Sequence, residues 1–134
     1  MEQKGTVLLV DDDPDLIACT STMLTSAGYR VVSAQDSNEA RERIKEGKPD
    51  LIVLDVMMGT QAEGFHFSYE LRGNPKTADI PIILLTGVSQ ATGMDFGAEK
   101  DSEFIQADEF LDKPVNPKEL FEKVAALLEK SEKQ

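Results

Sequence analysis

Five short runs of aliphatic residues alternate with segments of helical periodicity, and this alternation constrains the fold more than any other feature of the chain. The runs occupy residues 6–10, 30–34, 51–55, 80–86 and 109–112. Their nearly continuous apolar character is typical of strands that are buried on both faces. Such strands, joined by helical crossovers, form a parallel sheet with helices on both sides and right-handed connections. We therefore expect a doubly wound α/β fold with five strands.

The segments between the runs carry helix-face spacing and helix-boundary residues. Two of them place apolar residues along one helix face: Leu16, Ile17, Thr20, Met23, Leu24 and Ala27 in the first, and Leu120, Phe121, Val124, Leu127 and Leu128 in the last. Asp36 or Ser37 can cap the second helix, Gly28 and Gly73 follow the first and third, and Pro117 opens the last. Residues 87–106 contain three glycines and no sustained period. There we expect a short or irregular fourth helix.

Length and composition indicate one domain with a protein partner. The 134 residues, 40% of them hydrophobic, suffice for a single core, which we assign to residues 1–130 with a frayed tail at 131–134. The net charge of −11 argues against direct binding to nucleic acid or to an anionic membrane. No run approaches the roughly 20 apolar residues of a membrane span. The single cysteine, Cys19, is expected to be a small buried side chain, and a reducing, cytoplasmic setting fits.

Polar side chains stand at the carboxyl end of four of the five expected strands. In a parallel sheet these ends meet at one edge, where ligands bind. In chain order they present Asp11, Asp12 and Asp13, then Asp55, then Thr86, then Lys113. Taken singly, each has an ordinary interpretation as a helix cap, a backbone hydrogen bond or a solvated charge. Together they supply a nucleophile, hard oxygen ligands for a divalent cation and a cationic donor, which are the requirements of phosphoryl transfer.

In sequence order these residues resemble the receiver domains of two-component response regulators. The matching stretches are "VDD" at Asp11 and Asp12, "LIVLDVMM" at Asp55, "LLTG" at Thr86 and "FLDKPV" at Lys113. The resemblance covers nearly the whole chain and implies the flavodoxin-like strand order 2-1-3-4-5. The sequence differs from the family pattern after Asp55, where "MMGTQAEGF" lacks the usual proline and places Gly64 one position late.

The resemblance implies a phosphorylated aspartate and a Mg²⁺ site. Asp55 would be the nucleophile that accepts a phosphoryl group from a phosphohistidine. Asp12, Asp55 and the main-chain carbonyl of Met57 would ligate Mg²⁺, with Asp11 acting through a bound water. Asp13, which precedes Pro14, is instead expected to cap the first helix.

The resemblance also implies a conformational switch and a partner. Lys113 would pair with Asp55 and then with the phosphoryl oxygens, while Thr86 would bond a phosphoryl oxygen after transfer. Phe110 matches the aromatic switch position three residues before the lysine. The expected donor is a sensor histidine kinase or a histidine phosphotransfer protein, and His66 is expected to be a surface residue. The chain would then regulate a downstream protein and would not be an enzyme acting on other substrates.

Two other classes remain open on the residues alone. A Mg²⁺-dependent phosphohydrolase with an aspartate nucleophile would use the same groups, but such enzymes usually carry a second acid in a D-x-D pattern, which "DVMM" lacks. A flavodoxin-like binding module would carry a phosphate loop rich in Ser, Thr and Gly after the first strand. Three aspartates occupy that place here, and they would repel phosphate unless a metal intervened.

Overall fold

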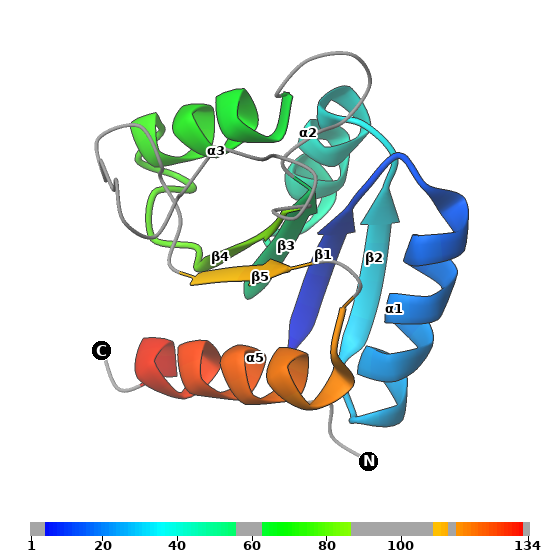
Figure 1. The fold of residues 1–134 in the computed structure, drawn as a ribbon. Helices are drawn as coiled ribbons and strands as arrows, with labels where there is room; N and C mark the ends of the chain where they lie inside the picture. The colour runs from blue at the N-terminus through cyan, green and yellow to red at the C-terminus, as the bar shows by residue number, and fades with distance from the viewer. Residues whose placement is uncertain (1–4, 56–62, 87–108, 113–114, 133–134) are drawn as a thin grey trace, which may run out of the picture.

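The computed structural model describes residues 5–55, 63–86, 109–112 and 115–132 and forms a parallel sheet with helices on both faces (Figure 1). The sheet has the order β2-β1-β3-β4-β5, as the resemblance implies. The strands are β1 Thr6–Val10, β2 Arg30–Ala34, β3 Leu51–Asp55, β4 Ile82–Thr86 and β5 Glu109–Asp112. The helices are α1 Pro14–Ser26, α2 Ser37–Glu46, α3 Glu63–Gly73 and α5 Pro117–Glu132. The predicted parallel α/β architecture is confirmed.

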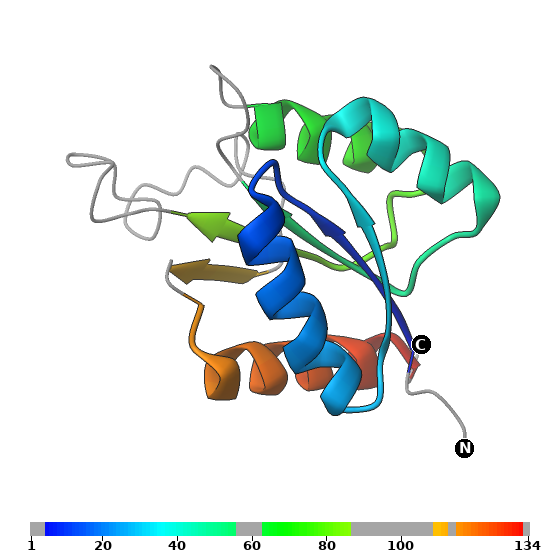
Figure 2. The same cartoon turned by 90° about the vertical axis from the view of Figure 1, so that its right-hand side faces the viewer.

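The sheet separates two hydrophobic cores. Alternate residues of the central strands face opposite sides, as the pleat requires. One core contains Leu8, Val10, Ile52, Leu54, Ile82 and Leu84, and the other contains Val7, Leu9, Leu51, Val53, Ile83 and Leu85. The first core is covered by α2 and α3 and the second by α1 and α5 (Figures 1 and 2). The apolar residues of the three central strands, β1, β3 and β4, are therefore enclosed on both faces, which explains their unbroken apolar runs, whereas the edge strand β2 is only partly buried.

Both ends of α1 are fixed by local hydrogen bonds. Asp13 is the N-cap, as predicted, and its carboxylate accepts from the backbone N–H of Asp15 at 3.0 Å and of Leu16 at 3.4 Å. At the other end Gly28 has φ +101°. Its N–H donates to the carbonyl of Thr25, and the N–H of Tyr29 donates to that of Leu24. This pair of bonds is a Schellman motif, which satisfies the last carbonyls of the helix.

Other boundaries agree with the sequence except at the start of the fourth strand. Asp36 is the N-cap of α2, α3 ends at Gly73, and α5 begins at Pro117. The fourth run was expected from residue 80, but β4 begins at Ile82. The N–H of Ile80 is used in a turn with the carbonyl of Thr77, and residue 81 is a proline without an N–H.

Three further expectations concern the helices. Cys19 is exposed, so the prediction of a buried thiol was wrong. The buried stripe of α1 passes through Thr20 and Leu24, and the adjacent position 19 lies about 100° around the helix from Thr20.

The helix α5 extends to Glu132, into the segment expected as a tail. Residues 87–106, with the expected fourth helix, lie outside the described residues.

No helix within the described ranges combines the length and the apolar character that crossing a bilayer requires.

Candidate metal centre at the carboxyl edge of the sheet

Asp11 is held at the end of β1 by its backbone and by its side chain. Its N–H donates to the carbonyl of Ala34 at 3.0 Å and so extends the pairing of β1 with β2 by one residue. Its carboxylate accepts from the backbone N–H of Asp13 at 2.9 Å. Asp11 is fully buried; the first bond fixes its backbone, and the second fixes one oxygen of its carboxylate.

Asp55 is brought beside Asp11 by the strand register. Val10 of β1 pairs with Leu54 of β3, so the residues that follow, Asp11 and Asp55, reach the same edge of the sheet together. Asp55 is 3% exposed and is the last residue of a strand that is buried throughout. The apolar run therefore delivers a carboxylate to a nearly water-free position at the strand end.

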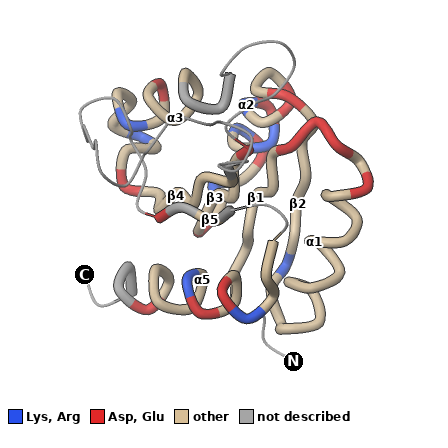
Figure 3. Tube along the Cα trace, in the orientation of Figure 1, with Lys and Arg blue, Asp and Glu red and all other residues tan. Residues whose placement is uncertain are grey.

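Asp11, Asp12 and Asp55 form one carboxylate cluster. One carboxylate oxygen from each lies within 4.8 Å of the other two, and Asp12 is the exposed member. Two negative charges about 4 Å apart repel by roughly 4 kcal/mol at an effective dielectric near 20. The positive end of the α1 dipole, which begins at Pro14, offsets part of this repulsion. The acidic stretch is visible where β1 leads into α1 (Figure 3).

The cluster fits a small divalent cation. Mg²⁺ prefers carboxylate and water oxygens, and these three carboxylates lie close enough together to hold one ion directly or through a bound water. Asp11 and Asp55 are buried, whereas Asp12 brings the cluster to the surface. Among the described residues, no other group of three or more His, Cys, Asp or Glu side chains is close enough to hold a metal.

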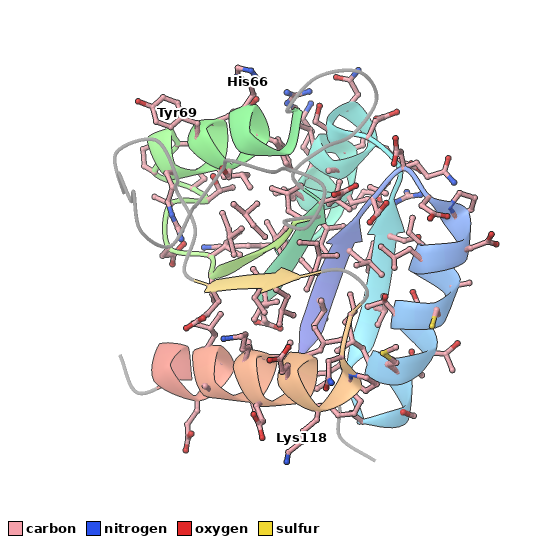
Figure 4. All side chains as sticks on the ribbon, in the orientation of Figure 1. His66, Tyr69 and Lys118 are labelled. Atoms are coloured by element: carbon pink, nitrogen blue, oxygen red, sulfur yellow. The ribbon has the colours of Figure 1, made fainter. Side chains whose placement is uncertain are left out.

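The remaining predicted site residues are placed only in part. Thr86 ends β4, directly opposite Asp112, which ends β5 and precedes Lys113 in the sequence. The backbones of these strand ends thus reach the same edge as Asp55. Met57 and Lys113 lie outside the described residues, as do the side chains of Thr86 and Phe110. His66 is exposed on α3 and points away from the sheet, as expected (Figure 4).

The hydrogen bond from the N–H of Asp13 to the Asp11 carboxylate was not predicted from the sequence. The spacing of the two aspartates, i and i+2, is that of an Asx-turn and could have indicated this bond. This bond orients the Asp11 carboxylate, which was expected only to interact with the metal through a water.

Comparison with known proteins identifies relatives over almost the whole chain. Residues 7–125 match the family model described as "Response regulator receiver domain". The chain is 36% identical over 131 residues to the probable transcriptional regulator ycf27 of Porphyridium aerugineum and covers 51% of it. It is 34% identical to the DNA-binding dual master transcriptional regulator RpaA of Synechocystis, matching over 95% of this chain and 50% of that protein.

Solved structures show the same fold. A CheY-like response regulator receiver domain protein from Methanospirillum hungatei superimposes with a TM-score of 0.80 at 26% identity, over 99% of this chain and 98% of that chain. The chemotaxis response regulator CheY4 of Vibrio cholerae gives a TM-score of 0.78 at 28% identity, over 95% and 99% of the two chains.

The chain spans about half the length of the curated relatives it matches. One of those relatives is named as DNA-binding. The expectation that no nucleic acid is bound directly therefore finds no support in these relatives.

Proposed function

Because this chain belongs to the response regulator receiver domain family, we propose that it is a phospho-accepting switch that receives its phosphoryl group on Asp55. The observation that carries the proposal is the cluster of Asp11, Asp12 and Asp55 at the carboxyl edge of the sheet. The proposed donor is a phosphohistidine of a sensor histidine kinase or a histidine phosphotransfer protein. A cytoplasmic location and a downstream protein target belong to the same proposal.

In the proposed transfer, a carboxylate oxygen of Asp55 attacks phosphorus while the P–N bond of the phosphohistidine breaks. The nearly complete burial of Asp55 excludes bulk water from the acceptor. Asp12 and Asp55, with Asp11 through water and the carbonyl of Met57, would hold Mg²⁺, which when bound neutralises charge on the carboxylates and the phosphoryl oxygens. The bond from the Asp13 N–H keeps the Asp11 carboxylate turned toward this site.

After transfer, three residues would report the new charge to the surface. Lys113 and Thr86 would bind phosphoryl oxygens, and Phe110 would change its rotamer in response. This part of the proposal rests on the sequence resemblance and on the position of Thr86 and Phe110 in β4 and β5. The consequence would be altered affinity for a protein partner.

Phosphorylation by acetyl phosphate with and without Mg²⁺, followed by intact-mass measurement, tests the proposal. We expect a Mg²⁺-dependent adduct of about 80 Da that is absent in Asp55→Asn. Asp79→Asn is the matched control, because Asp79 is exposed and pairs with Lys48 away from the cluster. An adduct that survives in Asp55→Asn would refute the assignment, and steady turnover of phosphomonoesters would favour the phosphohydrolase alternative.

A further inference from the structure

A groove of about 630 Å³ lies between α2 and α3, on a face of the sheet that the phospho-acceptor proposal does not use. Ile44 of α2 and Phe67 and Leu71 of α3 line it. Phe67 and Leu71 are almost fully buried and form the base, while Ile44 is only partly buried. Ile44 therefore provides most of the accessible apolar surface of the groove, above a base formed by Phe67 and Leu71.

The charge around this groove is opposite to that of the chain as a whole. The chain has 25 acidic and 14 basic residues. Among the described residues, the groove lining contains the basic residues Arg41, Lys45, Lys48 and Lys76 and one acidic residue, Glu70, while Glu42 and Asp79 pair with Lys45 and Lys48 from outside the lining. Basic residues are visible on α2 and close to the end of α3 (Figure 3). A local excess of cations beside an apolar base is complementary to a ligand that carries both carboxylates and an apolar group.

Arg41 and Glu70 form a fixed wall of the groove. Nε and Nη2 of Arg41 each donate to the Glu70 carboxylate at 2.7 Å, joining α2 to α3. The guanidinium also lies 5.5 Å from the centre of the Phe67 ring, a cation–π distance. The neighbouring Arg41 lowers the pKa of Glu70, so this carboxylate stays ionised and paired. Arg41 and Glu70 neutralise each other, so a ligand would pair with the other cations of the groove.

The lysines, in contrast, have exchangeable partners or open surroundings. Lys45 lies 3.7 Å from Glu42, Lys48 lies 3.0 Å from Asp79, and their side chains are 75% and 51% exposed. Ion pairs this exposed contribute little and can be replaced by the carboxylates of a ligand. Lys76 is exposed and also lines the groove. Three ammonium groups thus surround the apolar base without being committed to the fold.

We propose that the α2–α3 groove is a docking site for a short acidic segment of a partner protein. One apolar side chain of that segment would rest on Ile44 and the base of the groove, and flanking Asp or Glu side chains would accept hydrogen bonds from Lys45, Lys48 and Lys76. A long polyanion or an anionic membrane fits less well, because it would also meet the repulsion of a protein with net charge −11. A short segment feels mainly the adjacent lysines, since charges beyond about 8 Å are screened at physiological salt.

Fluorescence anisotropy with a labelled synthetic peptide tests this proposal on the whole chain. The probe is a short peptide with a central leucine flanked by aspartates and glutamates, compared with the same peptide carrying serine for leucine or glutamine for glutamate. Lys76→Gln is compared with Lys118→Gln, which has the same net charge. Lys118 is exposed on α5 and points away from the molecule on the side opposite α3 (Figure 4).

We expect saturable binding that Lys76→Gln weakens about two- to fivefold and that Lys118→Gln leaves unchanged. The triple variant Lys45→Gln/Lys48→Gln/Lys76→Gln should abolish binding, and its unchanged thermal unfolding would show that the fold is intact. Both altered peptides should bind more weakly than the probe. Equal effects of Lys76→Gln and Lys118→Gln, indifference to the leucine, or preferred binding of a single-stranded oligonucleotide would each overturn the proposal.

Discussion

Asp11, Asp12 and Asp13 are adjacent in the sequence, yet their carboxylates have three different surroundings. Asp11 is buried and accepts from the N–H of Asp13, Asp12 is the exposed member of the carboxylate cluster, and Asp13 caps α1. The turn from strand to helix directs Asp13 toward the first backbone N–H groups of α1 and leaves Asp11 and Asp12 in the carboxylate cluster. Substitution of each residue should therefore change a different property of the protein.

Replacement of Asp13 by alanine should lower stability while leaving the acceptor site in place. The variant loses a side-chain acceptor for two backbone N–H groups at the start of α1, which should cost about 1 kcal/mol. Urea unfolding measures the loss. Asp13→Ser, which keeps a capping oxygen, should recover most of it, and an equal loss in both variants would argue against capping.

At the level of secondary structure elements, the end of α1 depends on a backbone conformation that favours glycine. Gly28 has φ +101°, and Gly28→Ala should destabilise the protein by about 1–2 kcal/mol because a Cβ is strained in that conformation. Gly47→Ala is the control. Gly47, the C-cap of α2, has φ −174°, and a Cβ placed there meets no atom within 4 Å. Chemical denaturation should show a larger loss of unfolding free energy in Gly28→Ala than in Gly47→Ala. Similar losses in the two variants would contradict the role of the Schellman motif.

The pair between α2 and α3 should contribute to stability in a pH-dependent way. Arg41 lowers the pKa of Glu70, so the contribution is present at neutral pH and is lost as the pH falls through that lowered value. Because both side chains are more than a third exposed, the contribution should stay below about 1 kcal/mol.

Urea unfolding of wild type and Glu70→Gln at neutral pH and near pH 3 checks this expectation. The variant should be less stable at neutral pH, and the difference should shrink at the acidic pH. Glu42→Gln, whose carboxylate is 3.7 Å from Lys45, serves as a weaker ion-pair control. A difference between wild type and Glu70→Gln that grows on acidification would contradict the assignment.

Most elements in the described ranges could be predicted because their determinants are local. Asp13, Asp36 and Pro117 mark helix starts through caps and a fixed φ. The apolar runs mark β1 and β3 through their burial, whereas β2 is only partly buried. The burial of Cys19 was predicted wrongly, because helix periodicity does not show how wide the buried stripe is. The start of β4 was misplaced because the turn through Thr77 and Ile80 was not recognised.

At the scale of the whole molecule, occupation of the cluster by Mg²⁺ should stabilise the native state. Metal that binds only the folded protein adds about 1.4 kcal/mol at a tenfold excess over its Kd, and so raises Tm by about 3–5 °C. Thermal unfolding in Mg²⁺ and in EDTA measures this rise.

Asp12→Ala should lose both the rise in Tm and the Mg²⁺-dependent phosphorylation. Its metal-free form should be no less stable than metal-free wild type, because one of the repelling charges is gone. The same Mg²⁺ effect in Asp12→Ala would exclude this cluster.

The carboxylate cluster could be predicted from the sequence, because a parallel sheet brings the carboxyl ends of its strands to one edge however the helices pack. The α2–α3 groove could not, because it depends on how two helices far apart in the sequence approach each other. Ile44 and Lys45 lie three and four residues after Arg41, a spacing that places all three on one side of α2 and indicates a partly basic face. Nothing local to that stretch indicates that Lys76 lies on the same groove.

The division of the interior into two cores has a consequence for how such a protein can evolve. The groove rests on the core beneath α2 and α3, while α1 and α5 rest on the other, and the backbone of the central strands stands between them. Substitutions that reshape one side need not disturb the packing of the other, since distant sites without shared contacts usually act additively. A lineage can therefore exchange one set of binding partners for another on one side while inheriting the acidic edge intact.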